Sequence, residues 1–174
     1  MNNLSKILLF DIDWTLLRGT GKVFVNGHRE ALENILGITL KDDFDITPHE
    51  GKTGSRFFID IAEERGVDRA VTREALPQLA QYLATFCEEH RDELGVERLP
   101  HVQEALEGLG AGFGLGILTG NFRDVALLKL RLAELEHYFA FGAYGDISEI
   151  RSDLVEHALS QAGELYEQDF LPSA

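Results

Sequence analysis

The chain is poor in cysteine and in positive charge. Cys87 is its only cysteine, so no intrachain disulfide can form, and a reducing compartment is the simplest expectation. Sixteen Lys and Arg residues face 30 Asp and Glu residues, which gives a formal net charge of −14. Such a surface repels nucleic acid and anionic membranes, so we expect neither as a partner.

Long apolar runs are also missing. No stretch approaches the roughly 20 apolar residues that a membrane-spanning helix needs. The N-terminal apolar run covers only Ile7 to Phe10 before acidic residues follow, which does not suit a signal peptide. We therefore expect a cytoplasmic protein. A length of 174 residues suits one compact domain or a small domain that carries an insertion, and the oligomeric state cannot be read from the sequence.

Hydrophobic periodicity predicts an α/β fold with a Rossmann-like parallel sheet. Apolar runs predict strands at 7–10, 117–118 and 139–144, and amphipathic patterns predict helices at 28–36, 55–65, 72–90, 100–109, 123–135 and 152–165. Strands alternate with helices only in the C-terminal half. We therefore expect a discontinuous core of residues 1–17 and 96–174, interrupted by an inserted helical block over 18–95. Pro77 should kink the third of these helices or mark its true start.

Two acids follow the first predicted strand. Asp11 and Asp13 are two residues apart as that strand ends, so both side chains can point to one side. In open parallel sheets, ligands bind beyond the carboxyl ends of the strands. A hard divalent ion such as Mg²⁺ suits such a carboxylate pair and would also bridge a phosphate. One carboxylate can attack phosphorus while the other transfers protons, although two acids can also simply end a strand.

The segment Phe10-Asp11-Ile12-Asp13-Trp14-Thr15-Leu16-Leu17 resembles the first motif of haloacid dehalogenase-like hydrolases, close to their phosphoglycolate phosphatase-like branch. This resemblance implies an aspartyl-phosphate intermediate on Asp11, acid–base catalysis by Asp13, Mg²⁺ held by both, and a phosphate contact from Thr15. The family usually has a small residue such as glycine where Trp14 stands, so the floor of the site could differ here.

The second predicted strand end, Thr119-Gly120-Asn121, resembles the family's second motif. A hydroxyl, the following amides and the start of the next helix can hold phosphate oxygens there, although Asn121 can also simply cap that helix. For the cation of the third motif we expect Arg151, in place of the more usual lysine. Lys129 is a poorer candidate, because it lies about eight residues into its helix, roughly 12 Å along the axis from the phosphate end.

The family's fourth motif, an acidic pair on a further strand, has no counterpart before the sequence ends at Ala174. We therefore expect the C-terminal part of the core to be missing, through a truncated product, and metal affinity to be impaired. A partner chain that supplies the missing strand is an open alternative.

The helical block resembles the cap of the phosphoglycolate phosphatase-like branch. This resemblance makes Lys52 and Arg56 candidates for contact with substrate anions, with solvated loop charges as the alternative. Other binding sites are not expected. Gly51-Lys52-Thr53 lacks the earlier glycine of a P-loop, the glycines from 110 to 116 do not form a dinucleotide motif, and the histidines lack the spacing of a zinc site.

The leading hypothesis is a Mg²⁺-dependent phosphatase acting on a small phosphorylated metabolite. Within the same fold, a haloacid dehalogenase needs no acid for its leaving halide, so Asp13 favours phosphoryl transfer, while a phosphomutase remains open. The hypothesis from another class is a catalytically silent fragment, or a module that binds phosphate without turnover.

Overall fold

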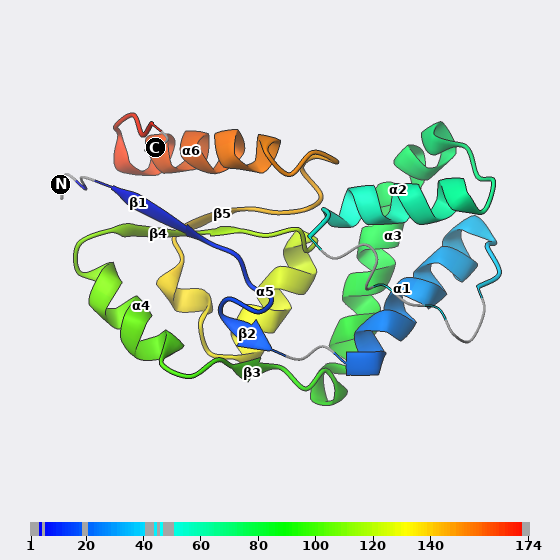
Figure 1. Cartoon of the computed structure of the whole chain (residues 1–174), viewed down its shortest axis with the longest axis horizontal. Helices are drawn as coiled ribbons and strands as arrows, with labels where there is room; N and C mark the ends of the chain where they lie inside the picture. Colours follow the sequence, from blue (N-terminus) through cyan, green and yellow to red (C-terminus); the bar gives the residue numbers. More distant parts are fainter. Residues whose placement is uncertain are drawn as a thin grey trace.

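The computed structural model describes residues 4, 6–18, 21–40, 44, 46 and 51–171. Figure 1 shows a sheet with its helices on one side of the molecule and a block of helices on the other. In the described part, no helix is long and apolar enough to cross a membrane. Most of the segment between residues 41 and 50 lies outside the described residues, as does the end of the chain after Leu171.

The parallel sheet has the strand order β1-β4-β5, formed by Ile7–Phe10, Gly114–Leu118 and Phe141–Ala143. Strand β1 pairs with β4 from Ile7↔Gly114 to Phe10↔Ile117, and β4 pairs with β5 from Gly116↔Phe141 to Leu118↔Ala143. The α/β class and all three strands were predicted correctly. The prediction made β4 too short, because its first residues alternate glycine with single apolar residues.

Helices cover both faces of this sheet. Helices α4 (Val102–Gly110) and α5 (Arg123–Leu132) pack with Leu115 and Ile117 on one face. Helix α6 (Asp153–Tyr166) packs on the other face, against Phe141 and Ala143. The two faces alternate along β1 as the pleat of a strand requires. Figure 1 shows α6 on the side of the sheet opposite to α4 and α5.

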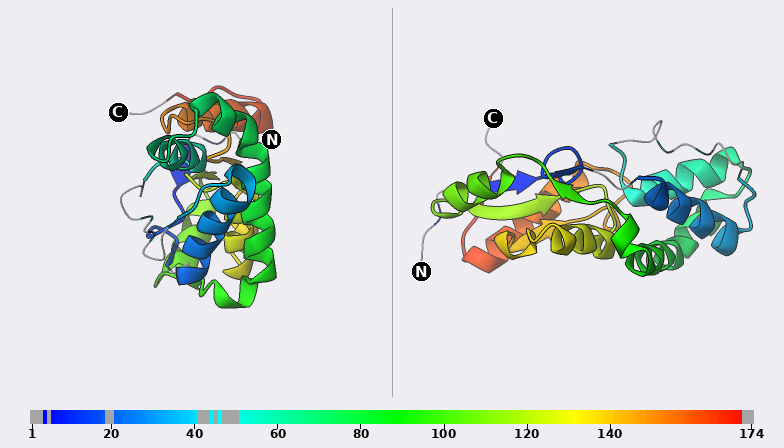
Figure 2. Two further views of the ribbon diagram at one scale, coloured as in Figure 1. Left: turned by 90° about the vertical axis from the view of Figure 1, so that its right-hand side faces the viewer. Right: turned by 90° about the horizontal axis from the view of Figure 1, so that it is seen from below.

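The helical block consists of α1 (Gly21–Leu36), α2 (Gly54–Glu64) and α3 (Arg69–Glu89). It has its own apolar core, which also includes Phe122, Val125 and Leu128 from the start of α5 and just before it. The block therefore lies beside the sheet and packs on α5, as the right-hand view of Figure 2 shows. Helix α3 continues through Pro77, which neither starts nor ends it.

A short antiparallel ladder lies where the chain passes between core and helical block. Strand β2 (Leu17–Arg18) pairs with β3 (Glu97–Arg98), and Arg18 and Glu97 form an exposed ion pair at 2.8 Å. Two single-turn 3₁₀ helices, Arg91–Glu93 and Glu136–Tyr138, complete the described elements. The ladder therefore brings together the two chain segments that connect the sheet domain with the helical block.

Candidate active site

The carboxyl ends of the sheet strands carry the polar residues singled out from the sequence. Asp11 follows β1 directly and Thr119 follows β4. Because the two strands are parallel neighbours with Phe10 opposite Ile117, both residues leave the sheet at the same edge. The structure therefore brings the first two motifs together at one edge of the sheet.

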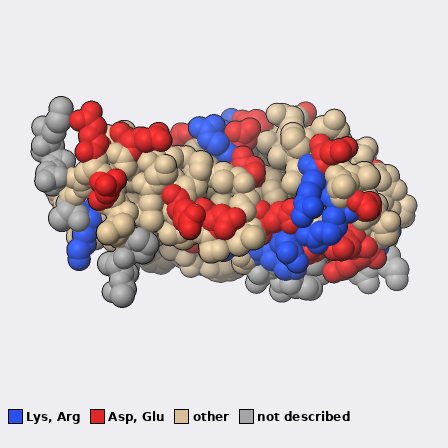
Figure 3. All heavy atoms as spheres, turned by 90° about the horizontal axis from the view of Figure 1, so that it is seen from above, with Lys and Arg blue, Asp and Glu red and all other residues tan. Residues whose placement is uncertain are grey.

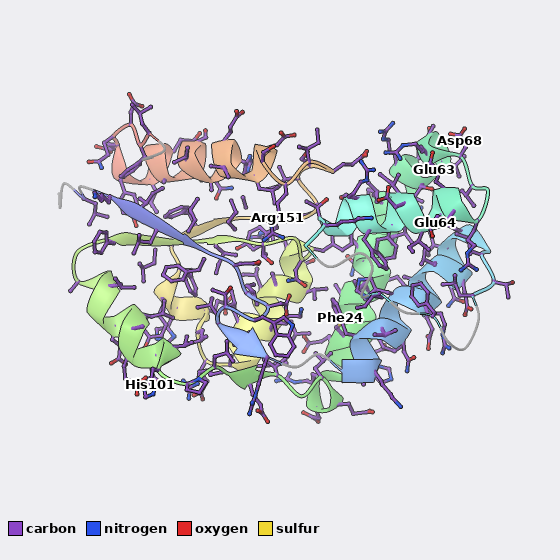
Figure 4. All side chains as sticks on the ribbon, in the orientation of Figure 1. Phe24, Glu63, Glu64, Asp68, His101 and Arg151 are labelled. Carbon is purple, nitrogen blue, oxygen red and sulfur yellow. The ribbon has the colours of Figure 1, made fainter. Side chains whose placement is uncertain are left out.

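Asp11 is held between a backbone amide and a guanidinium group. Its Oδ1 accepts a hydrogen bond from the Ile12 N–H at 2.9 Å, and its Oδ2 accepts one from Arg151 Nη2 at 2.7 Å. Arg151 also donates from Nη1 to the Gly51 carbonyl at 3.1 Å. Figure 4 places Arg151 near the junction of sheet and helical block. Arg151 thus meets Asp11, as the candidate third-motif cation should.

Asp13 belongs to a second, separate network. Lys129 Nζ donates to both of its carboxylate oxygens, at 2.9 and 3.1 Å, and Asn121 Nδ2 donates to Oδ2 at 2.6 Å. Lys129 also donates to Asn121 Oδ1 at 2.9 Å, and its Nζ lies 4.3 Å from the ring centroid of Phe24. The Lys129 side chain is 1% exposed, so Asp13 is the partner that neutralises a buried ammonium group.

The expectation that Lys129 lies too far from the site was wrong. The expected distance was based on the rise along the helix axis alone. The lysine side chain is long and points toward the helix N-terminus, which shortens the distance to the site. Residues 121, 125 and 129 also follow one another at spacings of four, so they share one face of the chain as it enters and forms α5. That spacing was the signal in the sequence that could have identified Lys129.

Two glycines allow the helical block to approach the strand ends closely. A Cβ on Gly120 would lie 2.2 Å from the Lys52 carbonyl oxygen, and one on Gly145 would lie 1.9 Å from the Gly120 oxygen. The Gly54 N–H donates to that Gly120 oxygen at 2.7 Å. Any other residue at position 120 or 145 would force the backbone apart. Residues 51–54 therefore pack directly against the second motif.

The remaining phosphate candidates lie near this edge. Thr119 is fully buried, and its Oγ1 accepts hydrogen bonds from the Asn121 backbone N–H at 3.3 Å and from Nδ2 at 2.9 Å. Thr15 is exposed in the turn after Asp13, where its own N–H bonds the Ile12 carbonyl at 3.3 Å. The phosphate contacts of Thr15, Thr119, Gly120 and Asn121 remain predictions.

Lys52 and Arg56 converge on an acid of the helical block. Lys52 Nζ lies 2.8 Å from Asp60 Oδ2, and Arg56 Nε lies 2.7 Å from Asp60 Oδ1. Partial burial favours the neutral form of Asp60, but hydrogen bonds from these two cations hold its pKa below the usual value. Figure 3 shows Lys and Arg atoms gathered with Asp and Glu atoms over the helical block. Substrate contact by Lys52 or Arg56 therefore has to compete with Asp60.

Asp11 and Asp13 are the candidate magnesium ligands, and both are paired with cations in this structure. Carboxylate oxygens are the right donors for Mg²⁺, but Asp11 is paired with Arg151 and Asp13 with Lys129. Within the described ranges, no group of three or more His, Cys, Asp or Glu side chains converges to hold a metal. Metal binding by Asp11 and Asp13 remains a prediction.

Comparison with known proteins identifies the family. The family profile described as haloacid dehalogenase-like hydrolase matches residues 8–168, almost the whole chain. This chain belongs to that family. No curated protein matches it significantly. The expected membership and hydrolase class are thereby confirmed.

Several solved structures share the fold of this chain. CbbY from Rhodobacter sphaeroides, solved with phosphate, is 16% identical with a TM-score of 0.65, over 91% of this chain and 72% of its own. A predicted phosphatase from Clostridium acetobutylicum is 17% identical with a TM-score of 0.62, over 92% and 71%. A candidate phosphoglycolate phosphatase from Lactobacillus plantarum is 20% identical with a TM-score of 0.60, over 91% and 72%.

Proposed function

We propose that this chain is a phosphatase that hydrolyses a phosphate monoester of a small metabolite through an aspartyl-phosphate intermediate on Asp11. The observation that carries the proposal is the convergence of Asp11, Arg151 and the Thr119–Asn121 turn at one edge of the sheet. An acid beside a guanidinium group and backbone amides provides both a nucleophile and a cradle for phosphate oxygens. The likeness to structures of phosphatases supports the same reading.

The first chemical step would form a bond between an Asp11 carboxylate oxygen and phosphorus. The bond from phosphorus to the ester oxygen breaks, and the leaving oxygen takes up a proton, for which Asp13 is the candidate donor. In the second step water attacks phosphorus, the acyl phosphate bond breaks, and Asp13 accepts the proton of that water. Arg151 would steady the phosphoryl oxygens in both steps, because a guanidinium group can donate to two of them.

Asp13 needs a free oxygen for this role. Both of its carboxylate oxygens now accept hydrogen bonds from Lys129, and Oδ2 also accepts one from Asn121. Proton transfer would thus require at least one of these bonds to lengthen when substrate binds. Because halide leaves unprotonated, Asp13 favours phosphoryl transfer over dehalogenation.

The helical block of residues 18–95 is proposed to be the cap over this site, with the core formed by 1–17 and 96–174. The contact of residues 51–54 with Gly120 supports this assignment, because it brings the block next to the second motif. A cap in this place would exclude water and select the substrate. We also propose that turnover requires Mg²⁺, as the family resemblance implies, with Asp11 and Asp13 as the candidate ligands.

The deciding experiment is phosphate release from p-nitrophenyl phosphate and a panel of metabolite phosphates, with and without Mg²⁺. Asp11→Asn is the control, because it keeps the shape of the side chain and removes the nucleophile. We expect turnover that is lost in this variant. Undiminished activity of Asp11→Asn would refute the nucleophile, and a folded chain without turnover would favour a phosphate-binding module.

A further inference from the structure

A cavity of about 140 Å³ opens beside the second motif, between the helical block and the core. Gly120 and Asn121 of the second motif line it together with residues 51–54 of the helical block. The rest of its lining is mostly apolar and includes Phe24, Phe57, Leu83, Phe122 and Val125. A phosphate held at Asp11 and Gly120 would therefore have this cavity as a neighbour for its leaving group.

His28 lines the same cavity as an uncharged aromatic side chain. Its ring packs against Phe24 at 4.3 Å and against Phe57 at 4.8 Å between centroids, and Nδ1 lies 2.8 Å from the Phe24 carbonyl oxygen. Burial, assisted by the charge of Lys129, lowers the pKa of His28 to about 4 despite that hydrogen bond. At neutral pH this histidine therefore brings no positive charge to the cavity.

The second ionisable side chain among the described lining residues is Lys52, which is paired with Asp60 at 2.8 Å. Asp60 of α2 therefore already neutralises the charge of Lys52. Within the described lining, a second phosphate or a carboxylate would lose its water without gaining an uncommitted cation, and that desolvation is costly. The described lining therefore favours an uncharged group over the charged end of a bisphosphate or of phosphoglycolate.

We infer that the leaving group is uncharged, compact and apolar, with a single ring as the best-fitting shape. The inference rests on the proposed phosphatase function and specifies its substrate class. An apolar cavity of about 150 Å³ is known to hold benzene, so the volume here matches one six-membered ring. Aromatic side chains around it favour edge or stacked contacts with such a ring.

The test compares two primary alkyl phosphates that differ only in what the methylene carries. Benzyl phosphate presents a phenyl ring and phosphoglycolate presents a carboxylate, while the scissile bond is of the same kind. We expect kcat/KM to be at least about tenfold higher for benzyl phosphate. Equal values, or a preference for phosphoglycolate, would overturn the inference while leaving the phosphatase function intact.

A binding measurement decides the inference even if neither ester is hydrolysed. Benzylphosphonate and phosphonoacetate are the matching non-hydrolysable pair, and calorimetry on the wild-type chain gives their dissociation constants. Tighter binding of benzylphosphonate would support the apolar site, although absent turnover with every ester would still refute the proposed function. Tighter binding of phosphonoacetate would refute the apolar site.

Substitutions of the residues that line the cavity test whether the leaving group binds there. Phe57→Leu should lower kcat/KM for benzyl phosphate severalfold, whereas Phe170→Leu, which changes an aromatic residue against α6, should not. Ile46→Lys adds a cation to the half-buried rim and should move the preference toward phosphoglycolate by about tenfold. An unchanged ratio of the two substrates in both lining variants would place the leaving group elsewhere.

Discussion

Lys129 holds both carboxylate oxygens of Asp13, at 2.9 and 3.1 Å, from a helix of the core that also supports the helical block. The two partners differ in solvent access: the Lys129 side chain is 1% exposed and that of Asp13 is 39% exposed. The pair is thus a buried cation neutralised by an acid at the surface of the site. Removal of Asp13 would leave the buried Lys129 ammonium without its counter-charge, whereas removal of Lys129 would leave a carboxylate that water can solvate.

The first prediction follows from this asymmetry. Asp13→Ala should lower the free energy of unfolding by about 3 kcal/mol, because among the described residues the Lys129 ammonium would keep only Asn121 as a polar partner. Asp11→Ala should cost less than about 1 kcal/mol, because its partner Arg151 is 33% exposed and keeps its bond to Gly51. Urea denaturation of both variants measures the difference. Equal losses would contradict the stabilising role assigned to Asp13.

The second prediction concerns the affinity for phosphate. Arg151→Ala should raise the inhibition constant of inorganic phosphate roughly tenfold or more, because a charged hydrogen bond to the anion is lost. Arg151→Lys should recover part of the affinity, since it restores the charge without the fork. Arg91→Ala is the matched control, an exposed arginine paired with Glu88. An inhibition constant that stays at the wild-type value in Arg151→Ala would make Arg151 a structural residue only.

Much of the core could be predicted from local pattern. The strand Ile7–Phe10 is one apolar run, and the acids that follow it mark its end within the sequence itself. Helix α1 shows the limit, because the prediction missed its first seven residues. That segment contains Gly27, a poor helix former that is needed here because a Cβ would lie 2.7 Å from Phe86 of α3. Packing between helices, invisible in sequence, overrode local propensity.

The site was predictable to the extent that its residues lie at strand ends. Asp11, Thr119 and Arg151 each follow a sheet strand or precede a helix, so the topology of a parallel sheet gathers them. Lys129 lies in the seventh position of α5 and reaches the site only through its side chain. The ladder between β2 and β3 was also missed, because strands of two residues are too short to show alternation.

The third prediction uses the backbone at Trp14. This residue has a φ of 61° and is 75% exposed, so its indole ring gains little packing to offset the left-handed backbone conformation. Trp14→Gly should raise the free energy of unfolding by about 1 kcal/mol, because glycine adopts this conformation without a Cβ clash. Trp14→Ala is the control, since it removes the indole but keeps the Cβ. Equal stability of the two variants would show that the backbone is unstrained there.

The fourth prediction concerns stability in acid. The pKa of His28 is lowered to about 4 by burial and by the nearby Lys129 charge, against an ordinary value of 6.5. At pH values between about 4 and 6.5, His28 is protonated in the unfolded chain but not in the folded chain. The free energy of unfolding should therefore rise with pH through this window. The loss on acidification from pH 7 to 4 should approach roughly 3 kcal/mol from this residue.

His28→Phe removes the titrating group among Phe24, Phe57 and Phe58 and should flatten that part of the curve. His157→Phe, in α6 and far along the chain from this cluster, serves as the control and should leave the curve unchanged. Urea midpoints measured at intervals from pH 7 to pH 4 give the comparison. A wild-type curve that is level between pH 6.5 and 4, or one that His28→Phe leaves just as steep, would show that His28 is not held neutral by its surroundings.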